Sequence, residues 1–225
     1  MGVGRRTEGA VPAFVVVPYG RADITIADRL GKGDRNRLAS LAADDDRQRA
    51  FLAGRAALFA AAAQLGERGV RIDASCPDCG VSHGRPVAEG GATRIHLALA
   101  HAAGGAFAAA ARVPIGIDAE PATASAERLA AVDDLAPGRG DALRRWTAIE
   151  AVLKADGRGL RVAPSAVQVW RRSALLDGVR YRLRTSRPDG CVVTVAELLT
   201  PQPESDGSRV SRSHASKNPS SGSSA

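Results

Sequence analysis

Long apolar runs are missing from this chain of 225 residues. None of its apolar stretches approaches the ~20 residues that a helix needs to cross a bilayer, so the sequence predicts no membrane span. Cysteine is also scarce, and three cysteines in a chain of this length argue against a disulfide framework. Aromatic residues make up only 4% of the chain, few for a surface that binds nucleic acid by base stacking.

Two nucleotide-binding signatures are absent as well, the GxGxxG fingerprint and the Walker loop. The N-terminus carries Arg5 and Arg6, but the apolar stretch at 11–17 is short and is interrupted by Pro12. We therefore predict no signal peptide. A cytoplasmic location is the default expectation.

Lysine is nearly absent, with only Lys32, Lys154 and Lys217 among the 31 basic residues. The net charge of +7 is therefore carried by arginine. A basic protein favours anionic partners, such as nucleic acid, a phosphorylated cofactor or an acidic protein. Charge alone does not choose among these three.

The hydropathy pattern predicts an α+β protein of meandering strands beside separate helices, more than alternating βαβ units. Phe51, Leu52, Leu58, Phe59 and Leu65 recur at helical spacing, which predicts a helix over 44–65. A turn-rich loop is expected over 76–91, and a helix containing Trp146 is expected to end at Gly157. The other expected elements are a helix at 124–135 and strands at 11–17, 22–26, 95–101, 106–112, 115–120, 167–171, 179–185 and 191–198. The strand at 115–120 is expected to continue the sheet of 106–112.

Each half of the chain thus has one main helix beside a few strands, which hints at two related lobes. We place an N-terminal lobe at 1–112 and a C-terminal lobe with the metal site at 113–200. Residues 201–225 include nine serines and three prolines with almost no apolar content. Such a segment cannot bury enough surface to order itself, so a disordered tail is predicted.

A CxxC pair, Cys76 and Cys79, is followed by Gly80 and His83. This spacing could form half of a zinc knuckle. Only Cys191 remains to complete a four-ligand set, and it lies over a hundred residues away. A tight turn at Pro77, Asp78 and Gly80 is the other interpretation, and both stay open.

Three carboxylates and one lysine lie in two short segments. In residues 116–120 (GIDAE), Asp118 and Glu120 alternate along a strand, so both point to one side, roughly 6–7 Å apart. In residues 146–160 (WTAIEAVLKADGRGL), Glu150 and Lys154 are separated by one helical turn. Each of these groups also has an ordinary structural interpretation. Asp118 and Glu120 could lie on an exposed strand edge, Glu150 and Lys154 could form a stabilising helix pair, and Trp146 could be a core residue.

Magnesium commonly binds through a few carboxylates while it also coordinates a substrate phosphate. Arginine suits phosphate because its planar fork binds two oxygens at once. The arginines at 47, 49 and 55 lie on the helix at 44–65, where a solvated face is the ordinary interpretation. His101 follows an apolar strand, where a hydrogen-bonded loop histidine is the ordinary interpretation. Together these groups could hold a pyrophosphate and stabilise its charge during displacement.

The two segments, in this order, resemble the 4′-phosphopantetheinyl transferases of the surfactin-synthetase type. That family carries a pattern close to (I/V)G(I/V)D(I/V)E, followed by WxxKEAxxKxxGxGL. Residues 84–86 (GRP) look like the family's GKP/GRP step, and residues 97–101 look like the strand that ends in its SH step. The resemblance covers about residues 45–200.

The resemblance implies two pseudo-symmetric lobes with an active site between them, each a small, mostly antiparallel sheet with a main helix. It implies transfer of phosphopantetheine from coenzyme A to a serine of an acyl or peptidyl carrier protein, by a monomer that binds neither nucleic acid nor membrane. Asp118, Glu120 and Glu150 would hold magnesium, and Glu150 would help to activate the carrier serine. Lys154 would contact the pyrophosphate and protonate its leaving end. His101, Arg85 and either Arg49 or Arg55 would contact the phosphates of coenzyme A.

Two positions depart from the family pattern. Ile149 stands where the family usually has lysine, and Ala100 stands where it usually has serine. These departures motivate a second hypothesis, a relative that binds coenzyme A or a carrier protein without turnover. A third hypothesis, a basic module that binds nucleic acid, rests on the arginine excess and the CxxC pair. The carrier protein and the pathway are not specified by the sequence.

Overall fold

The computed structural model describes residues 13–21, 24–76, 80 and 82–199. Its strands form two five-stranded sheets in which every neighbouring pair is antiparallel. The first sheet has the order β1 (Ala13–Pro18), β5 (Gly105–Ala111), β4 (His96–Ala102), β3 (Ser82–Glu89) and β2 (Arg71–Ser75). The second has the order β6 (Ile115–Pro121), β10 (Cys191–Leu198), β9 (Val179–Ser186), β8 (Ser173–Leu176) and β7 (Gln168–Val169). This arrangement confirms the predicted α+β class.

The two sheets repeat one topology. In each, the first strand pairs with the last strand of its half, and the remaining strands follow in descending order. A helix stands between the first and second strands of each half: α2 (Asp45–Gln64) in one, and α4 (Ala142–Asp156) in the other, where it follows α3 (Ala126–Leu135). The sequence hinted at two related halves, and the strand order of the first sheet corresponds to that of the second.

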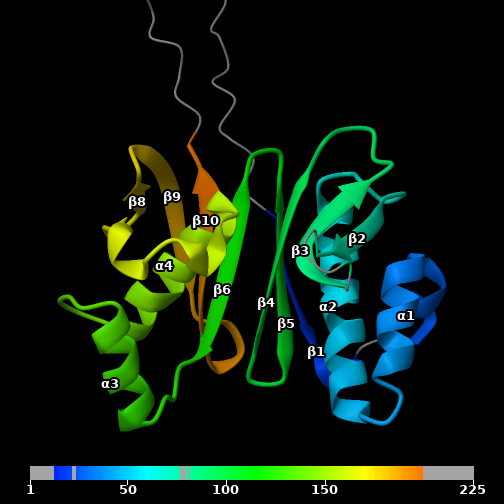
Figure 1. Cartoon of the computed structure of the whole chain (residues 1–225), viewed down its shortest axis with the longest axis horizontal. Coiled ribbons are helices and arrows are strands. Elements are labelled where there is room, and N and C mark those ends of the chain that lie inside the picture. The colour runs from blue at the N-terminus through cyan, green and yellow to red at the C-terminus, as the bar shows by residue number, and fades with distance from the viewer. Residues whose placement is uncertain (1–12, 22–23, 77–79, 81, 200–225) are drawn as a thin grey trace, which may run out of the picture.

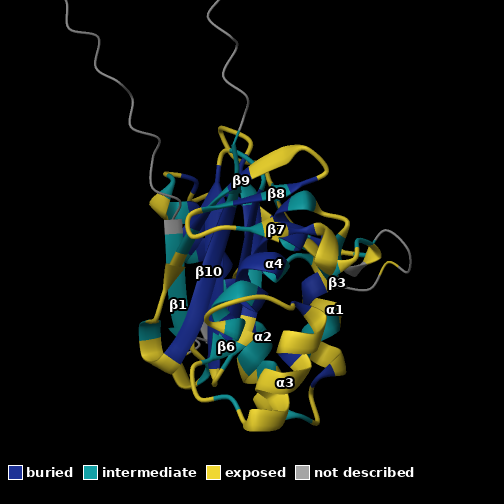
Figure 2. Cartoon of the chain, turned by 90° about the vertical axis from the view of Figure 1, so that its left-hand side faces the viewer, coloured by how far each residue is buried: buried dark blue, intermediate teal, exposed yellow. Residues whose placement is uncertain are grey.

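The molecule consists of four layers, in the order α2, first sheet, second sheet and α4 (Figure 1). One apolar core lies between α2 and the first sheet, a second between α4 and the second sheet, and a third between the two sheets. Strand β5 is buried at all of its positions because it is covered by α2 on one face and by the second sheet on the other. Figure 2 shows that β10 is buried along most of its length, and only its last two residues are partly exposed.

Side-chain caps mark the starts of three of the helices in the described part of the chain. Asp44, Ser125 and Asp141 each accept a hydrogen bond from the backbone N–H three residues later, at the start of α2, α3 and α4. No helix in the described part of the chain is long and apolar enough to cross a membrane.

Several predicted boundaries were wrong. The strand expected at 22–26 is replaced by a 3₁₀ helix over Ile24–Arg29, and the turn-rich loop expected at 76–91 contains β3. Strand β6 starts the second sheet and does not continue the first. The strand expected at 167–171 is only the two-residue β7, and α1 (Lys32–Ser40) carries no apolar periodicity that would have revealed it. The predicted tail at 201–225 and Cys79 lie outside the described residues.

Gly116 sets the distance between α4 and the second sheet. A Cβ atom at this position would lie 1.9 Å from the backbone oxygen of Ala151 and 2.6 Å from the backbone nitrogen of Ala155. Both are backbone atoms of α4, so no side-chain rotation can relieve the contact. Glycine is therefore required for the helix to lie this close to β6.

We expect Gly116→Ala to lower the free energy of unfolding by about 3 kcal/mol, because overpacking against backbone forces the helix away from the sheet. Urea-induced unfolding followed by circular dichroism measures this loss. Gly69→Ala is the matched control, since a Cβ there meets nothing within 4 Å. Equal stability of the two variants would contradict the argument.

Candidate functional site

Strand β6 presents its two acidic residues to α4. Asp118 and Glu120 alternate with the buried Ile117 and Ala119, which belong to the core between the sheets. Asp118 is buried, and its Oδ1 accepts a hydrogen bond from Lys154 Nζ at 2.6 Å. Its second oxygen, Oδ2, is also buried and has no hydrogen-bond partner. A carboxylate oxygen left in this state is costly unless a further cation or donor reaches it.

Burial raises the pKa of Asp118 to about 6, although the ammonium group of Lys154 acts in the opposite direction. The carboxylates of Glu150 and Glu120 raise this pKa further. Two of the acidic groups singled out in the sequence, Glu120 and Glu150, therefore repel the third, Asp118. Such mutual repulsion is the condition that a divalent cation relieves.

The three carboxylates are not drawn together in the structure. Glu120 forms an ion pair with Arg128 of α3 at 2.5 Å, while Asp118 is held by Lys154. Within the described ranges, no three His, Cys, Asp or Glu side chains are arranged so that they could hold a metal ion. The magnesium ligand set of Asp118, Glu120 and Glu150 thus stays a prediction.

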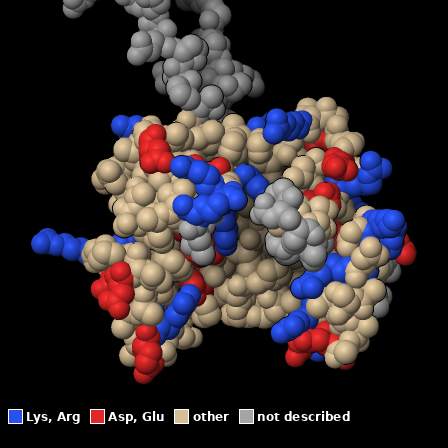
Figure 3. All heavy atoms as spheres, viewed as in Figure 1, with Lys and Arg blue, Asp and Glu red and all other residues tan. Residues whose placement is uncertain are grey.

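A pocket of about 310 Å³ lies between the two halves of the molecule. The first half contributes Arg85 of β3 and residues 97–99 of β4, and the second half contributes Lys154, Gly157 and Gly159. Figure 3 shows a hollow between the two halves, with Lys and Arg side chains gathered along its edge. The structure therefore brings Arg85 and Lys154 to one cavity, as their shared role in the sequence analysis requires.

Glycine at the end of α4 makes room for Arg85. Gly157 ends the helix in the left-handed conformation, with φ of +92°, and a Cβ there would lie 2.9 Å from a terminal nitrogen of Arg85. The same guanidinium group donates a hydrogen bond of 3.4 Å to the backbone oxygen of Ile115. Burial lowers the pKa of Arg85, and Asp156 acts against this shift. The arginine nevertheless stays charged at any physiological pH.

His101 is held by a residue that the sequence analysis missed. The Tyr19 hydroxyl lies 3.0 Å from His101 Nδ1, and the two rings are 5.7 Å apart. Gly54, in the middle of α2, leaves space for the ring: a Cβ there would lie 3.1 Å from His101 Cε1. A lone glycine inside an otherwise strong helix pattern is a signal for such close packing.

The pKa of His101 lies below its ordinary value, first because of burial and then because of the positive charges of Arg55 and Lys154. The ring is therefore neutral near pH 7. Burial raises the pKa of Tyr19, so that side chain keeps its hydroxyl proton. A neutral ring that accepts from Tyr19 at Nδ1 carries its own proton on Nε2, where it can donate to an anion.

The two arginines predicted to contact the 3′-phosphate occupy different surroundings. Arg49 is exposed and forms an ion pair with Asp46 at 2.6 Å. Arg55 is buried and binds Asp34 of α1 through two nitrogens of its guanidinium group, at 2.6 and 2.8 Å. Arg55 thus joins α1 to α2, and its positive charge helps to lower the pKa of His101. The ligand contacts of both arginines remain predictions.

The two positions that depart from the family pattern are buried. Ile149 packs in the core between α4 and the second sheet, and Ala100 packs in the core between the sheets. Apolar side chains suit both places. Cys191 also lies in the core between the sheets, where burial raises the pKa of its thiol. With Cys79 outside the described residues, the zinc hypothesis stays open.

Comparison with known proteins adds no family to this picture. No protein-family model matches the chain, and a search of curated proteins finds no match. The resemblance to phosphopantetheinyl transferases therefore rests on the sequence motifs.

Replacing Tyr19 by phenylalanine removes the hydrogen-bond partner of His101 Nδ1. We expect Tyr19 to donate to Nδ1 and so to hold the wild-type proton on Nε2, and we expect the neutral ring of the Tyr19→Phe variant to populate both tautomers. Long-range ¹H–¹⁵N spectra of the imidazole nitrogens distinguish the two cases. An unchanged Nδ1 shift would show that the Tyr19 hydroxyl does not select the tautomer.

The raised pKa of Asp118 predicts a pH-dependent stability. Between pH 3.8 and about 6 the folded state binds a proton that the unfolded chain has released, so the free energy of unfolding falls as the pH rises through this range. We expect Asp118→Asn to stabilise the metal-free protein at pH 7.5 by at most about 3 kcal/mol, from a shift of about two pKa units. The gain disappears near pH 4, where both residues are neutral.

Thermal unfolding at pH 4 and pH 7.5 measures this difference. Asp28→Asn serves as the control, because Asp28 is exposed. A variant at Asp118 that is less stable than the wild type at pH 7.5 would show that the Lys154 ion pair outweighs the cost of burial.

Proposed function

We propose that this protein is a magnesium-dependent 4′-phosphopantetheinyl transferase that acts on an acyl or peptidyl carrier protein. The observation that carries the proposal is the Asp118 carboxylate, buried beside Lys154 with one oxygen unpartnered. Lys154 in turn lines the pocket between the two halves. The order of the motifs, GIDAE before the Glu150–Lys154 helix, gives independent support.

The pocket suits the pyrophosphate of coenzyme A. Arg85 supplies positive charge from the first half and Lys154 from the second, and Gly157 and Gly159 add no side chains to the lining. An arginine fork can bind two phosphate oxygens, and a lysine adds a point charge. His101, neutral and tethered to Tyr19, would donate a further hydrogen bond from Nε2.

The acidic residues fit a magnesium ion by their chemistry. Carboxylates provide the hard oxygen ligands that magnesium prefers, Glu120 and Glu150 act electrostatically on Asp118, and Asp118 Oδ2 has no hydrogen-bond partner. Binding by Asp118, Glu120 and Glu150 would release Lys154 and Arg128 from their present ion pairs. The ion would neutralise charge on the pyrophosphate.

In the proposed transfer, the hydroxyl oxygen of the carrier serine attacks the phosphorus that bears the pantetheine group. Glu150 accepts the serine proton as the new P–O bond forms. The bond from that phosphorus to the bridging oxygen breaks, and adenosine 3′,5′-bisphosphate leaves. Lys154 gives a proton to the leaving phosphate oxygen or neutralises its charge. Positioning and charge neutralisation carry most of such a phosphoryl transfer.

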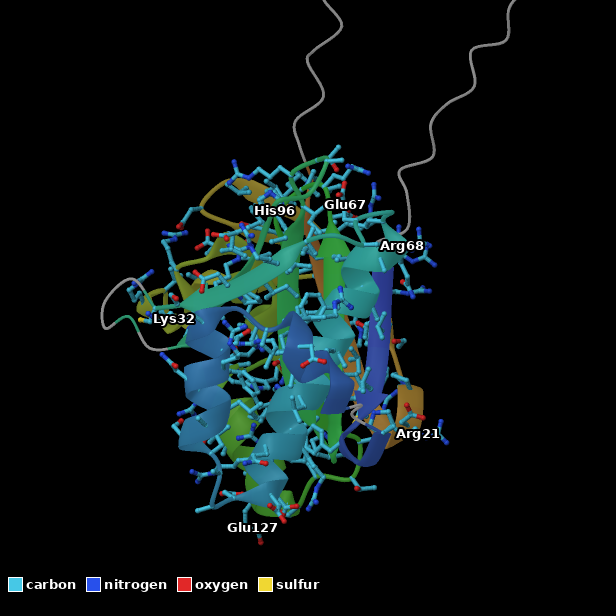
Figure 4. The ribbon with its side chains drawn as sticks, turned by 90° about the vertical axis from the view of Figure 1, so that its right-hand side faces the viewer. Arg21, Lys32, Glu67, Arg68, His96 and Glu127 are labelled. Atoms are coloured by element: carbon cyan, nitrogen blue, oxygen red, sulfur yellow. The ribbon has the colours of Figure 1, made fainter. Side chains whose placement is uncertain are left out.

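Intact mass spectrometry of an apo carrier protein tests the proposal after incubation with this protein, coenzyme A and magnesium. We expect a gain of one phosphopantetheine that EDTA prevents. We expect Asp118→Ala and Glu150→Gln each to lower the rate by at least about 100-fold, the usual scale for loss of a catalytic acid–base group. Glu127→Gln is the matched control, since Glu127 lies exposed on α3 (Figure 4).

Unchanged transfer by both variants would show that Asp118 and Glu150 do not have the roles assigned to them. Failure of the wild type with fatty-acid, polyketide and peptide carriers would contradict the proposed activity. Calorimetric binding of coenzyme A in that case would indicate the alternative, a family relative that binds without turnover.

A further inference from the structure

A second concave site lies at the other end of α4. Its volume of about 640 Å³ exceeds that of the pocket between the two halves. We call it the arginine cleft, and its lining consists of Arg144, Arg171, Arg172, Leu183, Thr185, Arg182 and Arg184. Five of these seven residues are arginines and none is acidic. Figure 2 faces the side of the molecule that carries β7, β8 and β9.

Neighbouring acids compensate little of this charge. Arg182 is 3.8 Å from Glu197, too long for a hydrogen bond, and Arg144 donates to the backbone oxygen of Arg171. Among the described residues, Arg171, Arg172 and Arg184 have no acidic partner. Guanidinium groups gathered in this way repel one another until an anion enters. A cleft lined by one sign of charge also concentrates the field inside it.

The strand and the helix each contribute to this crowding. Arg182 and Arg184 alternate with the buried Leu183 along β9, so they share one face of the strand, roughly 6–7 Å apart. Arg144 lies in the first turn of α4, where the helix dipole disfavours a positive side chain. The same N-terminal end favours an anion. The arginines therefore do not stabilise this part of the fold, whereas an anionic ligand would relieve the repulsion among them.

The arginine cleft shares no residue with the pocket between the halves. Arg144 and Lys154 are ten residues apart on α4, about 15 Å along the helix axis. A ligand in the arginine cleft is therefore not the pyrophosphate of the proposed transfer reaction. None of the five arginines lies in the two segments, 116–120 and 146–160, on which the proposed activity rests.

We propose that the arginine cleft binds a chain of two or more phosphates. Its volume lies within the ~300–1,000 Å³ that is common for small-ligand pockets. Planar guanidinium forks match phosphate oxygens, and several forks in one recess match several linked phosphates. Leu183 is the only apolar lining residue, which leaves little surface for an apolar ligand. The lining contains no aromatic side chain, unlike the extended basic groove with stacked aromatics that binds single-stranded nucleic acid.

Two sources could supply such a chain: inorganic polyphosphate and the triphosphate of a nucleotide. Trp170 precedes Arg171 and is 51% exposed, so a base could stack beside the cleft. Equal affinity for tripolyphosphate and ATP would identify the phosphate chain alone as the ligand. Tighter binding of ATP would indicate a nucleotide.

Isothermal titration of the full chain with sodium tripolyphosphate tests the assignment. We expect saturable binding that weakens as sodium chloride rises from about 50 to about 500 mM. The double variant Arg171→Gln/Arg184→Gln is expected to bind at least tenfold more weakly, since each lost charge-assisted contact is substantial. Arg184→Lys keeps the charge but loses the fork, and an intermediate affinity is expected.

Arg180→Gln is the matched control, because it removes the same charge from the same strand outside the cleft lining. Its affinity should stay within twofold of the wild type. The pocket between the halves is also proposed to bind a pyrophosphate, so tripolyphosphate is titrated into Arg85→Gln as well, and the binding that remains in this variant should be lost when Arg171→Gln/Arg184→Gln is added to it. Circular dichroism confirms that each variant is folded.

Three results would overturn the proposal. They are no binding at the lower salt concentration, equal weakening by the Arg180 control, and stronger binding of an RNA oligonucleotide or a poly-glutamate peptide than of tripolyphosphate. The last result would assign the cleft to a macromolecular partner.

Discussion

The backbone-to-backbone approach of α4 and β6 at Gly116 determines the geometry of the candidate site. Because no Cβ separates the strand from Ala151, the helix lies directly on the sheet. Lys154 can then reach Asp118, and the charge of Glu150 acts on the same carboxylate. A side chain at Gly116 would open the interface and separate these groups. The glycine of the GIDAE segment is thus as much a part of the site as its two acids.

This close packing has an electrostatic cost. Asp118 is buried, Glu150 and Glu120 raise its pKa, and Lys154 compensates only one of its oxygens. A protein optimised only for stability would place a neutral residue there, whereas functional sites often keep such groups. The arginine cleft shows the same property with the opposite sign, since its guanidinium groups crowd together with little acidic compensation. Both ends of α4 therefore hold charges that stability alone does not explain.

The duplicated topology places the groups in two halves. Arg85, His101 and Tyr19 come from the first half, and Lys154 and the acidic residues come from the second. Small residues allow the halves to approach: alanines fill β5 and much of β4, and Gly157 of the second half leaves room for Arg85 of the first. Neither half alone contains all of the lining of the pocket between them.

The sequence alone was sufficient for the fold class, the long helices, most strands and the order of the acidic residues, because helix and strand periodicities and capping residues are local signals. It was insufficient for α1 and β3, whose residues are mostly polar and are held by contacts with distant segments, such as the ion pair of Asp34 with Arg55. Only the tertiary structure decided that Tyr19 fixes His101, that Arg55 is buried, and that five arginines share one cleft. These contacts join residues far apart in the chain, and no local pattern encodes which distant side chains will meet.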